Sequence, residues 1–409
     1  MAAPSQEKLW TKSFILGTGV NFLLMVNYFS LMVVVADYAM KTYGAPASTA
    51  GLAASIFIIG ALVARLMSGR IMDHIGRKRL LVVGAVLDVA FSALYLTGIT
   101  FEALFVVRFL HGFAYGACST TIGTIVTSLV PNGRKGEGIG YYMLSSTLSA
   151  AIGPFIGMIL TSMVGFKVLF IVATTVAALS LLAATLLKAP EAPRVPRPQT
   201  KQHRIERPHL SNYLERSIIP IGSVCALLFF CYSSLLAFLT PFAAEQGLET
   251  AGSFFFVVYA IAMFVTRPFT GKLFDRRGDR IVMIPAFISF IAGMALLATV
   301  HQAFPLLVAA AFLGFGVGTV QSSGLALAVR ITPDSRLGLA NSTFYVLMDV
   351  GVGIGPLILG LAQPFWGYAG LFATMAGAAF VALMAYLLVS RPNGPMRRKL
   401  ETQEKAQLE

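Results

Sequence analysis

Charged residues are scarce in this sequence. Only 12% of its 409 residues are Asp, Glu, Lys or Arg, whereas 56% are hydrophobic; soluble domains carry roughly 25% charged residues. The mean hydropathy is +0.77. A water-soluble fold of this length would leave too much apolar surface exposed. The composition therefore excludes a soluble protein and predicts that a lipid bilayer covers most of the chain.

Residues that build metal and cofactor sites are also few. The three cysteines lie in apolar segments, where they are typical of small buried side chains, and the five histidines form no metal-ligand motif. The sequence contains no glycine-rich nucleotide-binding loop and no polar stretch long enough for a soluble domain. We therefore expect no enzyme activity, no metal site and no cofactor.

Acidic residues are fewer than basic ones, 18 against 31, which gives a net charge of +13. In a soluble protein this excess would suggest a nucleic-acid partner. Here 26 of the 31 basic residues fall in seven segments that share one side of a membrane if the N-terminus is cytoplasmic. The positive-inside rule then predicts a multi-pass protein of the inner (plasma) membrane with both termini in the cytoplasm, and no nucleic-acid partner.

Long apolar segments follow one another along the chain. A spanning helix needs about 20 mainly apolar residues, and the sequence predicts an all-α membrane protein with twelve such helices. The predicted spans are residues 12–37, 48–68, 80–99, 102–128, 138–163, 166–187, 217–243, 252–270, 281–300, 303–329, 338–361 and 367–390.

A proline-rich basic stretch divides the chain. Residues 188–216 contain five prolines among Lys and Arg, so they cannot form a long helix and are predicted to be a cytoplasmic linker. The predicted domains are an N-terminal six-helix bundle over 1–187, a C-terminal six-helix bundle over 217–390 and a cytoplasmic tail over 391–409.

The two halves repeat at a fixed offset. A shift of 202 residues superposes matching Gly, Pro, Arg and Asp positions without a gap, which chance pairing of apolar residues would not produce. Two parallel repeats of this kind place a substrate site at the midplane between two pseudo-symmetric bundles that rock against each other. The matches include Arg65, Gly69, Asp73 and Gly76 with Arg267, Gly271, Asp275 and Gly278, and Gly153 and Pro154 with Gly355 and Pro356.

The loops at residues 69–78 and 271–280 resemble the G-x-x-x-D-[RK]-x-G-[RK] signature of the major facilitator superfamily. The resemblance implies the twelve-helix fold of that family and a gating motif in each half. It also implies that Asp73 sits at the N-terminal end of a helix of the opposite half, near Arg77, and locks one access state. The alternative is a charged loop that only sets topology. The expected gating residues are Gly69, Asp73, Gly76, Arg77, Gly271, Asp275 and Gly278.

Two further helices carry family-like motifs. Arg108 resembles the arginine of the R-x-x-x-G motif, which the family links to proton coupling; the alternative is a structural tie to backbone carbonyls. His111 shares its helix face and is a candidate proton site or a satisfied interior histidine. A Gly-Pro pattern in residues 138–163 resembles that of antiporters, although Ser149 and Met158 replace two glycines and helix packing would also explain it. Its members are Gly140, Gly153, Pro154 and Gly157.

Three carboxylates lie within the predicted spans and are functional candidates by default. Asp37 and Arg108 are expected near the outer side of the N-terminal half and form the first pair to consider for proton coupling. Asp349 is expected to face a cavity and bind a proton or a cationic substrate; the alternative is a buried partner such as a helix end or a hydroxyl. For Asp88 a structural role is favoured, because its helix is peripheral in the family. Candidates for the substrate cavity are Asn21, Asn27, Tyr141, Phe230, Tyr232 and Tyr345.

The resemblance is closest to the twelve-helix proton antiporters for drugs and metabolites. It implies proton-coupled efflux of a small amphipathic or cationic molecule by alternating access. The alternatives are an uptake symporter for a sugar or an organic anion, and a metallophore exporter. The expected partners are a small-molecule substrate, protons and the lipid bilayer, and the family implies a monomer.

Overall fold

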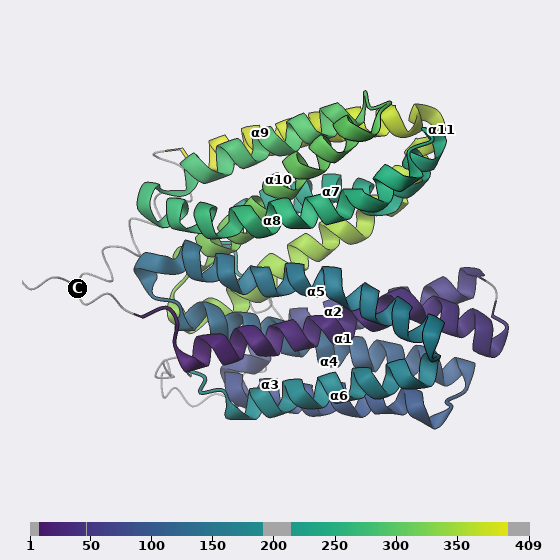
Figure 1. Cartoon of the computed structure of the whole chain (residues 1–409). Helices are drawn as coiled ribbons and strands as arrows, with labels where there is room; N and C mark the ends of the chain where they lie inside the picture. The colour runs from purple at the N-terminus through teal and green to yellow at the C-terminus, as the bar shows by residue number, and fades with distance from the viewer. Residues whose placement is uncertain (1–7, 46, 191–213, 392–409) are drawn as a thin grey trace, which may run out of the picture. The chain divides into compact units, whose positions relative to one another are not determined.

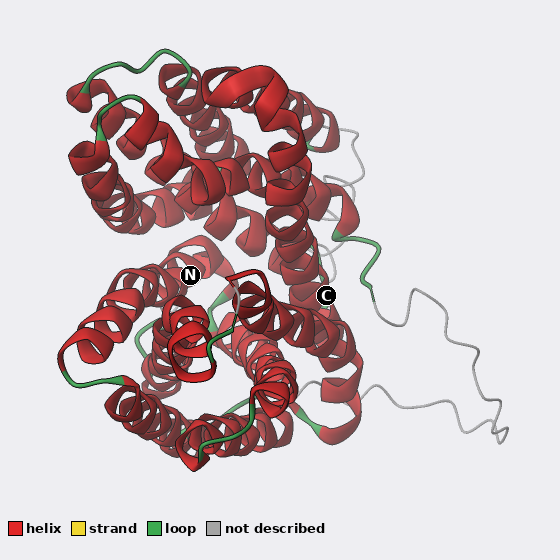
Figure 2. Ribbon diagram, turned by 90° about the vertical axis from the view of Figure 1, so that its right-hand side faces the viewer, coloured by secondary structure: helices red, strands yellow, loops and turns green. Residues whose placement is uncertain are grey.

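The computed structural model describes residues 8–45, 47–190 and 214–391. Over this part of the chain the regular structure is helical, and no strand occurs (Figures 1 and 2). The helices are α1 (Lys12–Tyr43), α2 (Ala47–Ile75), α3 (Arg77–Leu94), α4 (Phe101–Leu129), α5 (Lys135–Met163), α6 (Phe166–Leu186), α7 (Ile219–Glu245), α8 (Glu249–Arg277), α9 (Asp279–Leu297), α10 (Ala303–Arg330) and α11 (Leu337–Val389).

The last of these, α11, consists of two helices that meet at Gly367. This glycine has φ 62 and ψ 178, which interrupts the helical path; its repeat mate Gly165, with φ 88, separates α5 from α6. The described chain therefore has twelve long helices. Eleven are long and apolar enough to cross a membrane, and the twelfth, α2, contributes a shorter apolar run over Ser55–Gly69. The predicted all-α fold with twelve helices is confirmed.

The helix ends follow the 202-residue offset of the sequence. Helix α2 begins at Ala47 and α8 at Glu249; α3 begins at Arg77 and α9 at Asp279. Two short 3-10 turns, η2 (Asn132–Arg134) and η4 (Asp334–Arg336), occupy the same place before α5 and α11. The repeat therefore extends from the sequence to the placement of each helix along the chain.

The chain forms two compact units. The first comprises residues 1–131, 145–215 and 334–342, and the second comprises residues 132–144, 216–333 and 343–409. The first turns of α5 and α11 are thus grouped with the unit built from the other half of the sequence. The bundle boundaries expected from the sequence at 187 and 217 stay predictions, and most of the predicted linker and tail lies outside the described residues.

Glycines allow the central helices of each unit to approach closely. A Cβ added to Gly60 or Gly112 would overlap the backbone carbonyl of the facing helix in the pair α2 and α4, and Gly314 of α10 is in the same position against Tyr259 of α8. Small residues at such contacts allow the dispersion contacts that hold membrane helices together. This close packing places α4 and α10 among the most enclosed helices of their units.

Candidate functional site

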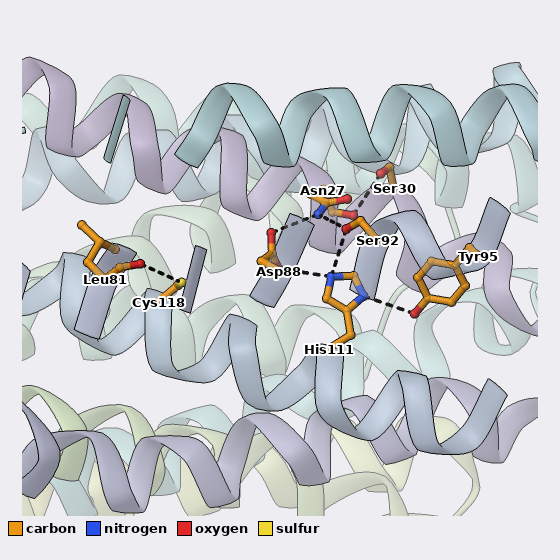
Figure 3. Close-up of polar contacts among 8 residues, drawn as sticks. All are labelled: Asn27, Ser30, Leu81, Asp88, Ser92, Tyr95, His111 and Cys118. Atoms are coloured by element: carbon orange, nitrogen blue, oxygen red, sulfur yellow. Dashed lines mark hydrogen bonds and ion pairs between the residues drawn. The ribbon is translucent and has the colours of Figure 1, made fainter. Parts of the chain in front are cut away.

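A cluster of polar side chains is buried inside the first unit. His111 of α4 lies between Asp88 of α3 and Tyr95, which begins the 3-10 turn η1 (Tyr95–Thr97) (Figure 3). Its Nε2 is 3.1 Å from Asp88 Oδ1 and its Nδ1 is 3.2 Å from the Tyr95 hydroxyl. The side chains of His111 and Asp88 are only 2% and 3% exposed.

Asn27 of α1 completes the cluster from the other side of the carboxylate. Its Nδ2 donates to Asp88 Oδ2 at 3.3 Å and to Ser92 Oγ at 3.1 Å, while Ser92 lies 3.4 Å from His111 Nε2. Both oxygens of Asp88 therefore have a polar partner. We call the five residues Asn27, Asp88, Ser92, Tyr95 and His111 the Asp88 cluster.

The Asp88 cluster has partners for two protonation states of the imidazole. With the ring neutral, Nε2–H can donate to Asp88 and Nδ1 can accept from the Tyr95 hydroxyl. A second proton on Nδ1 requires only that the Tyr95 hydroxyl rotates and accepts, and the imidazolium then forms an ion pair with Asp88. Burial makes an isolated charge costly, whereas a hydrogen-bonded pair is tolerated. Either arrangement keeps both ring nitrogens of His111 and both oxygens of Asp88 hydrogen-bonded, whereas Asn27 Oδ1 has no hydrogen-bond partner among the described residues.

Sequence analysis named three members of the Asp88 cluster but did not join them. His111 was expected to be a proton site or a satisfied interior histidine on the helix face of Arg108, Asn27 a cavity residue, and for Asp88 a structural role was favoured; Ser92 and Tyr95 were missed. A signal for Ser92 was present, because it lies four residues after Asp88 and shares its helix face. Tyr95 lies seven residues after Asp88, in the turn that follows α3, so the spacing was a weaker indication that the two side chains lie close together.

Arg108 is buried in the first unit and contacts α2. Its Nε donates to the Ala53 carbonyl at 2.9 Å, and its guanidinium carbon lies 4.4 Å from the centre of the Phe57 ring. Such a cation on an aromatic face is stabilised by the ring quadrupole. These contacts correspond to the structural alternative, a tie to backbone carbonyls. A role for Arg108 in proton coupling stays a prediction.

The structure does not bring Asp37 and Arg108 together. Asp37 is 40% exposed and pairs with Lys41, one helical turn later in α1, at 2.8 Å. In this structure Asp37 is thus paired with Lys41, and a joint role of Asp37 and Arg108 in proton coupling stays a prediction. The physical reason is local, since a lysine four residues away on the same helix face is within reach of the carboxylate.

The second gating motif holds the start of α5 within the second unit. Asp275, near the end of α8, accepts hydrogen bonds from the backbone N–H groups of Gly136 at 2.8 Å and Glu137 at 2.9 Å. These are among the first N–H groups of α5, which have no partner inside the helix. The negative charge is also stabilised by the positive end of the helix dipole. Gly271 permits the approach, because an added Cβ would lie 2.5 Å from the Gly136 carbonyl oxygen.

The first gating motif contacts the start of α11 within the first unit. Arg77 donates from Nη2 to the carbonyl of Asp334 at 2.9 Å, and a Cβ on Gly69 would lie 3.1 Å from the Cα of Leu339. Gly76 and Gly278 have φ of 91 and 86, and each permits the tight turn to the next helix. The side chain of Asp73 lies outside the described residues, so its expected place at a helix N-terminus stays a prediction.

Replacing Asp275 by Asn should loosen the first turn of α5. The neutral amide loses the charge-assisted part of both hydrogen bonds and the interaction with the helix dipole, so we expect hydrogen exchange at Gly136 and Glu137 to accelerate about tenfold or more. Exchange measured by mass spectrometry on peptides that cover residues 132–144 tests this. Asp334→Asn removes an exposed charge and is the control. Equal exchange in Asp275→Asn and the wild type would contradict the contact.

The glycines of the antiporter-like pattern are packing positions. A Cβ on Gly153 would lie 2.6 Å from Phe29 Cβ, and one on Gly157 would lie 2.5 Å from the Ser30 carbonyl oxygen of α1. Gly140, in the second unit, faces the carbonyl of Arg267 at 3.2 Å in the same test. Pro154 lies inside α5. The packing alternative therefore accounts for these positions, and a link to antiport stays a prediction.

The remaining candidates are distributed over both units. Asn21 is fully buried in the first unit and donates to Ser145 Oγ at 2.8 Å and Ser146 Oγ at 3.0 Å. The other candidates lie in the second unit and are partly buried: Tyr141, Phe230, Tyr232, Tyr345 and Asp349. The cysteines are buried and free, as expected; Cys118 donates to the Leu81 carbonyl at 3.7 Å (Figure 3).

The apolar helices, their repeat and the polar groups buried inside them define a polytopic membrane protein. Comparison with known families gives the narrower identity. The sequence pattern of the Major Facilitator Superfamily matches residues 18–277 and, in a second copy, residues 249–408. The chain belongs to this superfamily of transporters and is not an enzyme.

Individual relatives are distant. The chain is 26% identical to an uncharacterized MFS-type transporter of Methanocaldococcus jannaschii, over 94% of this chain and 97% of the relative. It is 24% identical to the multidrug resistance protein MdtL of Klebsiella pneumoniae, over 85% and 88% of the two chains. Among solved structures, the fucose:proton symporter FucP of E. coli has a TM-score of 0.71 at 18% identity, over 91% and 97% of the chains, which shows a shared fold.

Proposed function

We propose that this protein is a proton-coupled exporter of a small amphipathic molecule. The observation that carries the proposal is the buried pair of His111 and Asp88, 3.1 Å apart, with Tyr95 on the other imidazole nitrogen. Buried ionisable groups inside membrane helices are expensive and mark proton or substrate pathways. The Asp88 cluster is suited to carry one proton per transport cycle.

The direction of transport is supported by relatives and by motif likeness. MdtL, which matches most of the chain, is described as a multidrug resistance protein, and the Gly-Pro pattern of α5 resembles that of antiporters. The likeness to FucP concerns the fold and does not distinguish export from uptake. We propose the plasma membrane as the location, with both termini cytoplasmic on the basis of the basic loops.

In the proposed cycle, protonation of His111 on the outer side and deprotonation on the inner side accompany a change of access. Asp275 and the first turn of α5 act as one latch that opens and closes during this change, because their contact is polar, local and reversible. Ionised Asp88 stabilises the imidazolium, and release of the proton restores the neutral pair. One proton moves inward for each substrate that moves outward.

Transport into everted vesicles tests this proposal. With an acidic lumen, an exporter that exchanges substrate for protons should accumulate amphipathic dyes and raise the lumenal pH. We expect dye accumulation to fall to background when the pH gradient is collapsed or when His111 is replaced. Two outcomes would instead support the uptake symporter. One is substrate accumulation that requires an alkaline lumen. The other is that no dye of a chemically varied panel accumulates, while sugars or organic anions leave the acidic lumen together with protons.

A further inference from the structure

The second unit also contains a buried arginine. At the 202-residue offset this unit has apolar residues in place of Asn27, Asp88 and His111. Arg267 of α8 is 1% exposed. Its Nη2 donates to Gln321 Oε1 of α10 at 2.8 Å, whereas Nε and Nη1 have no hydrogen-bond partner among the described residues. The side chain of Arg267 is therefore enclosed by the second unit.

A buried guanidinium that makes a single hydrogen bond, to a neutral group, is not compensated for the loss of its hydration. Removing an arginine side chain from water is costly, and one amide oxygen does not offset that cost. No Asp or Glu of the described chain forms an ion pair with Arg267; the carboxylate of its own motif, Asp275, is held by the α5 N-terminus and Arg330. Two N–H donors of Arg267, at Nε and Nη1, are therefore left without an acceptor among the described residues.

The surroundings of Arg267 contain further polar groups and an aromatic wall. Tyr259, two turns earlier in α8, stacks on Tyr232 of α7 with ring centres 5.9 Å apart. The Tyr259 hydroxyl has no hydrogen-bond partner in the described part of the chain, and both Tyr259 and Tyr345 lie near the guanidinium. At Gly318 of α10 an added Cβ would lie 2.4 Å from Met263 Cγ and 3.5 Å from Arg267 Nε, so the glycine lets α10 pack closely against Met263 and the guanidinium.

The repeat shows that the fold does not require these polar residues. Arg65 occupies the equivalent place in the first half, but the sequence around it differs. The positions of Tyr259, Thr319 and Tyr345 hold apolar residues there. These counterparts, at the 202-residue offset, are Phe57, Ala117 and Met143. These three positions are therefore polar only in the second half, whereas the position of Gln321 is polar in both halves, as Ser119 in the first.

We propose that Arg267, with Tyr259 beside it, binds a carboxylate group of the transported molecule. Carboxylates match the planar, multi-donor guanidinium better than they match an ammonium, and such charge-assisted hydrogen bonds are about twice as strong as neutral ones. The stacked rings of Tyr232 and Tyr259 provide an apolar surface for the body of the ligand. This inference rests on the proposed function and narrows its substrate to amphipathic organic anions.

Binding to purified protein in lipid nanodiscs tests this site without any proton gradient. The probes are three aromatic carboxylates and their neutral amides: naphthalene-2-acetate, benzoate and 4-phenylbutyrate with the corresponding amides. We expect the wild type to bind at least one carboxylate about 10- to 100-fold more tightly than its amide, as measured by calorimetry. Arg267→Gln should abolish this preference, and Arg267→Lys should retain part of it.

Controls separate a binding role from a structural one. Arg65→Gln removes the equivalent arginine of the first half and should leave the preference unchanged. If Arg267→Gln does not yield folded protein, Tyr259→Phe keeps the ring stack and should reduce the preference severalfold. If chloride or phosphate blocks carboxylate binding at equal concentration, the site binds inorganic anions and the proposal is overturned. The proposal is also overturned if the wild type binds none of the three carboxylates more tightly than its amide.

The two proposals fail in different ways. If the wild-type protein shows no pH-driven transport but binds carboxylates in preference to their amides, only the proposal of a proton-coupled exporter is overturned. Normal pH-driven transport with no dependence of binding on Arg267 would overturn only the carboxylate site.

Discussion

Replacing His111 by Gln should abolish proton-driven transport and leave substrate exchange intact. Glutamine retains an N–H that can donate to Asp88 and an oxygen that can accept from Tyr95, so the cluster stays hydrogen-bonded. It cannot bind the additional proton. We expect transport driven by a pH gradient to fall about 100-fold, the lower range for loss of a positioned proton-transfer group. Counterflow of labelled substrate needs no net proton movement and should persist.

Asp88→Asn tests the same site from the acidic side. The amide has the shape of the carboxylate but cannot stabilise an imidazolium, so protonation of His111 would create an uncompensated buried charge. We expect the same separation of gradient-driven transport from counterflow. The measurements are dye accumulation and lumenal pH in everted vesicles, with Asp334→Asn as an exposed control. Loss of coupling in Asp37→Asn together with normal coupling in Asp88→Asn would assign the proton to the carboxylate of α1 instead.

The fold was predictable because its signals are local or repeated. Each span is a run of apolar residues, and the turns that separate them contain glycines such as Gly76 and Gly165, whose positive φ few other residues adopt. Gly367 follows the same rule and separates the two helices of α11, which the apolar runs predicted as spans 338–361 and 367–390. The element order therefore follows from features that need no knowledge of tertiary contacts.

The site was predictable only in its parts. Arg108 and His111 share a face of α4 by spacing, but Arg108 binds the α2 carbonyl of Ala53, whereas His111 binds Asp88 of α3. Spacing places residues on a helix and does not say which neighbouring helix each will meet. Asp88 was assigned a structural role because its helix is peripheral in the family. It faces inward in its own unit, and that orientation depends on packing that a single sequence does not display.

The two halves of the repeat carry different polar residues on one scaffold. The positions of Asn27, Asp88 and His111 are occupied in the second half by buried apolar side chains, Phe229, Phe290 and Leu313. Of the polar residues around Arg267, Tyr259 and Tyr345 are replaced by apolar residues in the first half, whereas Gln321 corresponds to Ser119. A repeat that arose by duplication needs only one copy of each chemical function. The asymmetry therefore supports a proton site in one half and a ligand site in the other, as the two proposals state.

Replacing Gly112 by Val should produce the largest loss of stability in the first unit. A Cβ at this position would overlap the Phe57 carbonyl of α2, which is backbone and cannot rotate away. Helices α2 and α4 must then separate, which removes the contacts of Arg108 with Ala53 and Phe57 as well. Overpacking of this kind costs about 3 kcal/mol or more, equivalent to a drop in melting temperature of about 6 to 12 °C for a unit of this size.

Thermal unfolding of the purified protein, followed by loss of the monodisperse peak in size-exclusion chromatography, measures this effect. Gly19→Ala is the matched control, because a Cβ on Gly19 of α1 would meet nothing within 4 Å, and alanine is the better helix former. Gly314→Val, at the equivalent place against Tyr259, should destabilise the second unit by a similar amount. If Gly112→Val has the same melting temperature as the wild type, helices α2 and α4 are not packed as closely as the contact at Gly112 indicates. The position of His111, one residue earlier, would then also need to be reconsidered.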